Sequence, residues 1–270
     1  MKLSVFPLAS LLLLLLSIPS IAQIPDVIPD EYSRQFRRHE RRIDRAANRD
    51  ADTIVRLDPI EAFPIQPTFY ALETGNWGGD YLGINQRASE ITGRARRKAV
   101  VFVFDTGGCL DHPLLEGKVW NELGRVFTGE ANCADGHGHA THVAGIIAGA
   151  APDYPLGIAR MIDIKIVPIK VLSNQGSGSF QGITAGVEYA NVEAAKLTSA
   201  GYFVAYNLSL GGSGSWAPLE EAFQAAEKMG VVICAANGNT GNTPVQYPGR
   251  SVYTLGTAAL QQSGSGVTRA

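Results

Sequence analysis

The segment DGHGHATHVAG, from Asp135 to Gly145, holds three of the five histidines of the chain. Three neighbouring imidazoles are compatible with a metal site, with a catalytic base or with a histidine-rich helix start. A zinc-protease helix needs two histidines at i and i+4 with a glutamate between them. Here His139 and His142 stand at i and i+3 without an intervening glutamate, and no further ligands are obviously placed. The pattern therefore favours a base held by a carboxylate over a metal centre.

Two other residues carry side chains suited to work with such a base. Asp105 comes directly after the apolar run AVVFVF, and Asn239 lies in the small-residue segment AANGNTGN. An aspartate at a strand end is commonly structural, and an asparagine beside glycine is an ordinary turn residue. Alternatively, the carboxylate orients an imidazole and the amide donates a hydrogen bond to an oxyanion in acyl transfer. If so, Asp105 and His139 should lie within hydrogen-bonding distance.

The elements that must position these residues follow from hydrophobic patterning. Short apolar runs rich in β-branched and aromatic residues are typical of strands buried on both faces, and here they alternate with helical patterns. Such alternation predicts an α/β fold of three layers, a mostly parallel sheet with helices on both faces. The predicted strands are residues 99–104, 164–172, 202–210, 231–236 and 252–258, and the predicted helices are residues 139–150, 180–200 and 218–230.

The start of the chain differs in composition from the rest. Residues 1–22 combine Lys2, an apolar run at 8–18 and small residues at the end, which is typical of a secretory signal peptide. That run is too short to span a membrane, so we expect a secreted protein that is not membrane-bound after cleavage. Residues 23–69 are first arginine-rich and then proline-rich, without a clear strand pattern, and indicate a polar extension or a pro-segment. Residues 70–270 are the predicted folded domain.

Charge and cysteine content narrow the class further. The formal net charge of −2 gives no electrostatic basis for nucleic-acid binding. Export places the three cysteines in an oxidising compartment, where Cys109 and Cys133 either pair or remain free thiols. Pairing requires their Cα atoms to lie within roughly 7 Å. Cys234 lies in a predicted buried strand, so we expect a free and unreactive thiol there.

Five blocks of the sequence resemble, in order and spacing, those of the subtilisin-like serine proteases. They are VFVFDTGG, GHGHATHVAG, VPIKVLSNQGSGSF, NLSLGGSGS and VVICAANGN. The resemblance runs from about Asp80 to the C-terminus. It implies a monomeric endopeptidase that acts on polypeptides, or is blocked by peptide-like inhibitors, and needs no cofactor.

The same resemblance assigns roles to individual residues. It makes Asp105 the triad aspartate, His139 the general base and Asn239 the oxyanion donor. It makes His142 a packed helix residue and His137 an exposed loop residue. The two walls of the substrate cleft are then Gly176, Ser177 and Gly178 on one side and Ser209, Leu210 and Gly211 on the other.

The sequence departs from the family pattern at three places. Leu114 replaces an aspartate that binds a structural calcium in many members, which weakens the case for that ion. Gln246 replaces a small residue near the base of the primary specificity pocket. The Gly-Thr-Ser-Met-Ala block of the nucleophile is absent, and Ser263 and Ser265 lie in a predicted polar loop.

The absent serine block leaves three functional hypotheses. The first is a secreted endopeptidase whose sequence here ends before the nucleophile, with residues 70–270 an incomplete catalytic domain that is inactive and poorly stable alone. The second is a pseudoprotease that binds peptides or inhibitors without hydrolysing them. The third, a zinc hydrolase that uses the histidine cluster, has the weakest support from the spacing.

Overall fold

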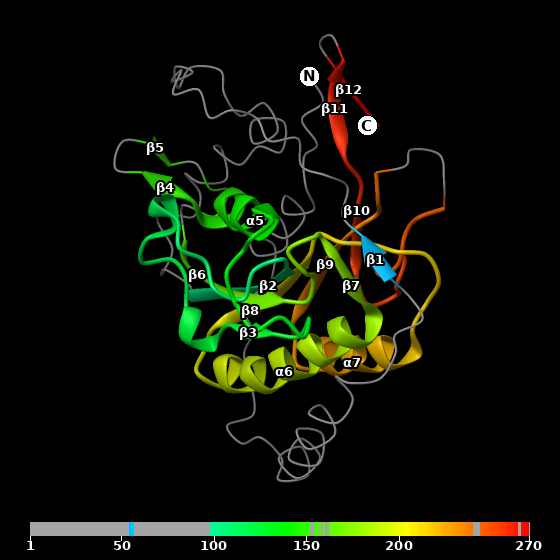
Figure 1. Cartoon of the computed structure of the whole chain (residues 1–270), viewed down its shortest axis with the longest axis horizontal. Helices are drawn as coiled ribbons and strands as arrows, with labels where there is room; N and C mark the ends of the chain where they lie inside the picture. Colours follow the sequence, from blue (N-terminus) through cyan, green and yellow to red (C-terminus); the bar gives the residue numbers. More distant parts are fainter. Residues whose placement is uncertain are drawn as a thin grey trace.

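A six-stranded sheet forms the centre of the fold. The computed structural model describes residues 54–56, 98–151, 154–155, 157, 159, 162–239, 244–263 and 266–269. Within this part, the strand order is β10-β9-β8-β2-β6-β3, and every neighbouring pair is parallel (Figure 1). The strands are β2 (Lys98–Asp105), β3 (Arg125–Val126), β6 (Asp163–Lys170), β8 (Phe203–Leu208), β9 (Val232–Ala236) and β10 (Leu255–Thr257).

Helices cover both faces of this sheet. Helix α5 lies on one face, and α6 and α7 lie side by side on the other (Figure 1). The three-layer α/β prediction is therefore confirmed. The bounds are α5 (His139–Ala148), α6 (Phe180–Ser199) and α7 (Ala217–Lys228), with short 3₁₀ turns at Pro113–Leu115 and Asn121–Leu123.

Strand β2 shows why the apolar runs become central strands. Val100, Phe102 and Phe104 point into the core beneath α6 and α7. Val101 and Val103, which alternate with them, point into the core beneath α5. All five side chains are fully buried, so both faces of the strand must be apolar.

The helix ends follow local chemistry. Ser179 caps α6, because its Oγ accepts a hydrogen bond from Gly182 N at 3.1 Å. Pro218 lies in the first turn of α7, and Gly230 follows its end with a φ of +79°. Helix α5 differs because Gly138 at its N-cap has no side chain to donate or accept. Another residue must satisfy its first amide groups.

Three small antiparallel pairs complete the described structure. They are β1 (Ile54–Arg56) with β7 (Ser177–Ser179), β4 (Ala150–Ala151) with β5 (Tyr154–Pro155), and β11 (Leu260–Ser263) with β12 (Gly266–Arg269). One strand here was not predicted, and one expectation was wrong. Residues 23–69 do contain a strand, because Ile54–Arg56 pairs with a distant edge. Ser263 belongs to a strand instead of a polar loop, because it pairs with Gly266 across a two-residue connection.

Several predictions fall on residues that are not described. The signal peptide at 1–22, most of the extension at 23–69, the start of the folded domain at residue 70, and Ser265 all lie outside the described ranges. Within the described ranges, no helix combines the length and the apolar character needed to cross a membrane.

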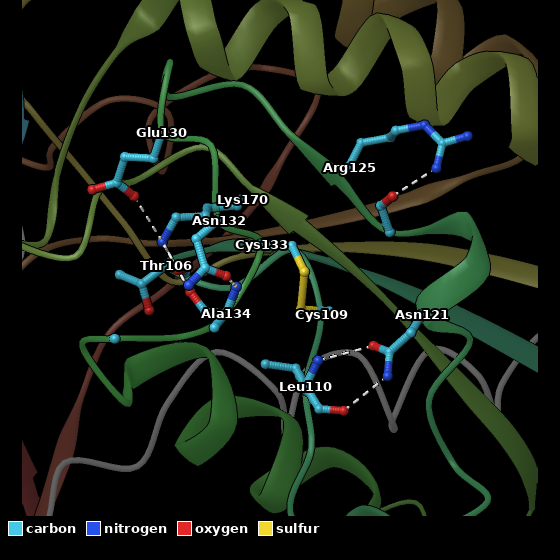
Figure 2. The surroundings of a disulfide bond; sticks show 12 residues. Thr106, Cys109, Leu110, Asn121, Arg125, Glu130, Asn132, Cys133, Ala134 and Lys170 are labelled. Carbon is cyan, nitrogen blue, oxygen red and sulfur yellow. Dashed lines mark hydrogen bonds and ion pairs between the residues drawn. A yellow bond between two sulfur atoms is a disulfide. The ribbon is translucent and has the colours of Figure 1, made fainter.

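A disulfide joins Cys109 and Cys133, with their Cα atoms 5.2 Å apart (Figure 2). It connects the loop after β2 to the loop before α5. Backbone contacts reinforce it, since Gly108 N and Cys109 N both donate to Cys133 O. Cys234 is buried and free, as predicted, and burial raises the pKa of its thiol to about 12. The structure thus decides the pairing that the sequence left open.

Removing this disulfide should lower the free energy of unfolding by roughly 3–4 kcal/mol. The bond closes a loop with a sequence separation of 24 residues, so its loss gives the unfolded chain more conformational entropy. The measurement is urea unfolding of the Cys109→Ser/Cys133→Ser double variant beside the parent chain. Reductant should destabilise the parent and leave the double variant unchanged. Equal stability of the two proteins would contradict the prediction.

Candidate active site

Asp105 and His139 meet in a buried contact at the carboxyl edge of the sheet. Nδ1 of His139 lies 2.7 Å from Asp105 Oδ1 and 2.8 Å from Oδ2. Asp105 is fully buried and His139 retains only 5% of its exposure. The distances confirm the geometric prediction made from strand and helix placement.

The contact follows from the way two elements end and begin. Asp105 is the last residue of β2, and His139 is the first residue of α5, which packs on the same strand. Thr106 N donates a hydrogen bond to Asp105 Oδ1 at 2.7 Å. The buried carboxylate therefore accepts from a backbone amide and faces the imidazole, and this compensates for its lost hydration.

The electrostatics of the pair raise the pKa of His139. Burial lowers the pKa of His139, but the charge and hydrogen bond of Asp105 and the charge of Asp135 raise it more. The net pKa lies above the ordinary histidine value. With Nδ1 directed at the carboxylate, Nε2 is the nitrogen left to exchange a proton with another group.

The other two histidines of the cluster differ from expectation. His142 is exposed instead of packed, because the buried stripe of α5 runs through Ala140, Val143 and Ile147. Partial loss of hydration beside the helix and the charge of His139 lower its pKa, although the side chain is exposed. His137 is half-buried instead of exposed. Its ring packs edge-on against the ring of His139, with the two ring centroids 6.2 Å apart. This ring contact accounts for the half-buried state of His137.

Sequence reasoning missed three residues that hold the pair in place: Thr106, Asp135 and Lys170. Asp135 accepts hydrogen bonds from Thr106 and from the first turn of α5. Burial raises the pKa of Asp135, but these hydrogen bonds outweigh burial and lower it. The signal in the sequence was an aspartate shortly before a helix whose own N-cap is glycine.

Lys170 is a fully buried cation behind the same loops. It ends β6 beside Asp105 in the parallel register. Its Nζ donates to Thr106 O and lies 3.1 Å from Glu130 Oε2 (Figure 2). It also donates to Asn174 Oδ1. Burial raises the pKa of Glu130, but the amide of Asn174 and the charge of Lys170 lower it more. A lysine inside an apolar run signals such a paired site, since unpaired lysine is almost never fully buried.

One predicted cleft wall lies immediately before α6. Gly176 has a φ of +70°, and Ser177 and Gly178 belong to β7. A side chain at Gly178 would collide with the backbone at Val171. Strand β7 can therefore pass close to the segment that follows β6 only because Gly178 has no side chain. In the structure the edge is paired with β1, Val55 standing opposite Gly178.

The other predicted wall and Asn239 follow the ends of β8 and β9. Ser209 and Leu210 are buried, whereas Asn239 is exposed at the carboxyl end of β9. Because β2, β8 and β9 are parallel neighbours, these residues end at the same sheet edge as Asp105.

Gln246 lies between these two strand ends. A Cβ at Gly211 or Gly238 would collide with its side chain. The half-buried Gln246 side chain therefore occupies the space that the two glycines leave open.

The described part of the chain contains no group of three His, Cys, Asp or Glu side chains arranged to hold a metal ion. The histidine cluster is therefore not such a set there. What it provides is one imidazole against a carboxylate.

Comparison with known proteins identifies the family. The model of the subtilase family, Peptidase S8, matches residues 96–268, which is more than half of the chain. This chain belongs to the subtilase family of serine proteases. The S41 psychrophilic protease has a similar structure, with a TM-score of 0.55 and 30% identity over 70% of this chain and 63% of that one.

Two curated relatives show how much of a subtilase the chain represents. It is 35% identical to thermitase of Thermoactinomyces vulgaris over 61% of this chain and 56% of thermitase. It is 38% identical to the cell wall-associated protease of Bacillus subtilis (strain 168) over 64% of this chain and 18% of that protein. The chain thus spans about half of thermitase and a smaller share of the other relative.

Replacing Asp105 by asparagine should bring the pKa of His139 below its ordinary value of about 6.5, because burial then outweighs the remaining charge of Asp135. In the parent chain the raised pKa contributes stability that is complete below about pH 6.5. This contribution is lost as the pH rises through the raised folded-state value.

Two measurements check this expectation. An NMR titration of the His139 Hε1 signal reports the pKa, and urea unfolding across the same pH range reports the stability. Asp163→Asn, which removes an exposed carboxylate at the start of β6, is the matched control and should leave the titration unchanged. An unaltered His139 pKa in the Asp105→Asn variant would contradict the assigned cause.

Proposed function

We propose that this chain carries the general base, its aspartate and an oxyanion donor of a secreted serine endopeptidase. The observation that carries the proposal is the contact of His139 Nδ1 with both oxygens of buried Asp105. Membership of the subtilase family supports peptide-bond hydrolysis as the reaction to which this pair belongs. The proposed general base is His139, its aspartate is Asp105 and the oxyanion donor is Asn239.

The geometry suits proton transfer at Nε2. Asp105 keeps the Nδ1 proton in place, so Nε2 of the neutral ring offers its lone pair to a serine hydroxyl. As the serine oxygen attacks the carbonyl carbon, its proton moves to Nε2 and His139 becomes an imidazolium. The charge of Asp105 stabilises that cation, and the raised pKa of His139 expresses this stabilisation. His139 then returns the proton to the leaving amine.

Asn239 is the proposed donor to the oxyanion. It lies at the carboxyl end of β9 after Gly238, whose φ of +96° turns the chain there. Its exposed side chain carries N–H groups of the kind that stabilise the charge developing on a carbonyl oxygen.

The nucleophile is not supplied by a recognisable motif in these residues. The printed sequence contains no Gly-Thr-Ser-Met-Ala block. We therefore propose that the 270 residues bind polypeptide without hydrolysing it. The alternative of a pseudoprotease, a peptide-binding relative without hydrolytic activity, has the same binding surface and differs only in the encoded serine.

The pairing of β1 with β7 supports peptide binding along the predicted cleft wall. Ile54–Arg56 adds to Ser177–Ser179 as an antiparallel strand. An extended substrate would make the same main-chain contacts, which depend little on its side chains. We therefore propose that a substrate binds along β7 at the place that Ile54–Arg56 occupies in this structure.

The proposal also includes export and a monomeric state. The leader-like composition of residues 1–22 and the name of the cell wall-associated relative support a location outside the cytoplasm. We propose that the protein needs no cofactor and that its partners are polypeptides, not nucleic acid or membrane.

The purified 270-residue chain should hydrolyse a fluorogenic peptide no faster than buffer does, since the members of a triad act as a unit. Hydrolysis that His139→Ala abolishes would show that another serine of this chain is the nucleophile. Sequencing the transcript past the codon for Ala270 separates the two hypotheses. A reading frame that continues into a Gly-Thr-Ser block supports the endopeptidase, and a stop codon supports the peptide-binding alternative.

Substituting Val55 by proline should free the β7 edge, because proline removes a backbone donor and disfavours the paired strand. We expect exchange of the Ser177–Ser179 amides to accelerate, by about tenfold for each lost hydrogen bond. An added peptide with the sequence of residues 51–58 should restore protection, and a scrambled peptide should not. Ala51→Pro, which precedes the described strand in the sequence, is the matched control. Unchanged exchange in the Val55→Pro variant would rule out this edge as the binding surface.

A further inference from the structure

Asp135 uses both carboxylate oxygens within a small region beside the site. Oδ1 accepts from Thr106 Oγ1 at 2.6 Å and from Gly138 N at 2.9 Å. Oδ2 accepts from Thr141 N at 2.8 Å and from Thr141 Oγ1 at 2.7 Å. The carboxylate thus replaces the cap that Gly138 cannot supply, and its charge suits the N-terminus of α5.

Thr106 joins this carboxylate to the catalytic one. Its N–H donates to Asp105 Oδ1, and its hydroxyl oxygen accepts from Ala140 N at 3.1 Å. Since the hydroxyl accepts from an amide, its own proton is available for Asp135. A continuous series of hydrogen bonds therefore runs from Asp105 through Thr106 to the residues on either side of His139.

We propose that Asp135 is a positioning residue for His139, holding the first turn of α5 against the end of β2 so that the imidazole meets Asp105. This inference rests on the proposed role of His139 as a base. Asp135 itself acts through Thr106 and the helix start, and Asp105 makes the direct contact. The site then uses two carboxylates with different tasks.

An asparagine at position 135 could not make the same contacts. Both oxygens of Asp135 accept from a backbone N–H, one from Gly138 and one from Thr141. In either orientation, the amide NH₂ of asparagine would face one of these donors, which leaves a donor without an acceptor. The contacts therefore require an acceptor on both sides, as only the ionised carboxylate provides.

Other charged or titratable groups surround the same imidazole. Asp105 faces it from β2, His142 from α5 and His137 from the preceding loop, while Lys170 ends the neighbouring strand β6. Asp135 is the second carboxylate whose charge raises the pKa of His139. Its substitution thus has an electrostatic effect and a geometric effect, which a test must separate.

The test is NMR on the full 270-residue chain. The signals of the His139 ring are identified as those that disappear in the His139→Gln variant. Three variants separate the effects: Asp135→Asn removes the charge and one of the two acceptor oxygens, Thr106→Val removes only the hydroxyl link, and Thr106→Ser retains it. We expect Asp135→Asn to lower the His139 pKa. Asp135→Asn and Thr106→Val should both weaken the downfield Nδ1–H signal of His139 and speed exchange of the Ala140 and Thr141 amides by on the order of tenfold. Thr106→Ser should resemble the parent chain.

Matched controls exclude a general loss of stability. Phe223→Leu, in the core beneath α7 on the other face of the sheet, lowers stability without touching the site, so it should leave the Nδ1–H signal and the His139 pKa unchanged. A normal Nδ1–H signal in both Asp135→Asn and Thr106→Val overturns the proposal, as does an equal change in Phe223→Leu. These readouts do not involve hydrolysis or peptide binding, so failure of the proposed function would leave them intact.

Discussion

The buried carboxylate of Asp105 imposes the main constraint on this structure. A carboxylate without solvent is costly unless charged or hydrogen-bonding partners replace the lost water. Thr106 N and the imidazole of His139 supply them. Because His139 lies 34 residues away, the loop after β2 and the start of α5 must be held together. The disulfide, the buried cation of Lys170 and the capping carboxylate of Asp135 all contribute to this.

The parallel sheet explains how one edge can collect the remaining groups. Every strand from β10 to β3 runs in the same direction, so the segments after β2, β8 and β9 emerge together. The glycines at these ends let the backbone approach closely, and Gln246 occupies the space between Gly211 and Gly238. An extended segment of this chain already pairs with the adjacent β7 edge. The carboxyl edge of the sheet thus holds an imidazole paired with a carboxylate and a polar amide, and β7 offers a main-chain edge for pairing.

The errors of sequence reasoning have a common physical origin. His142 is exposed instead of packed because the buried stripe of α5 passes beside it, and His137 is half-buried instead of exposed because its ring lies against that of His139. Ile54–Arg56 was not recognised as a strand, since three residues show no periodicity and their partner lies more than a hundred residues later. Lys170 and Asp135 were overlooked because their importance comes from carbonyl and amide groups on other segments.

The sequence by itself determined the layered α/β architecture, the succession of its main strands and helices along the chain, and the placement of Asp105 and His139 at element ends. These features depend on local hydrophobic periodicity and on the rule that parallel strands end at one edge. Only the tertiary structure decided that Cys109 bonds to Cys133, that Asp135 caps α5 from outside the helix, and that β7 accepts β1. Such choices depend on distances between segments remote in the chain, and local patterning carries no record of those distances.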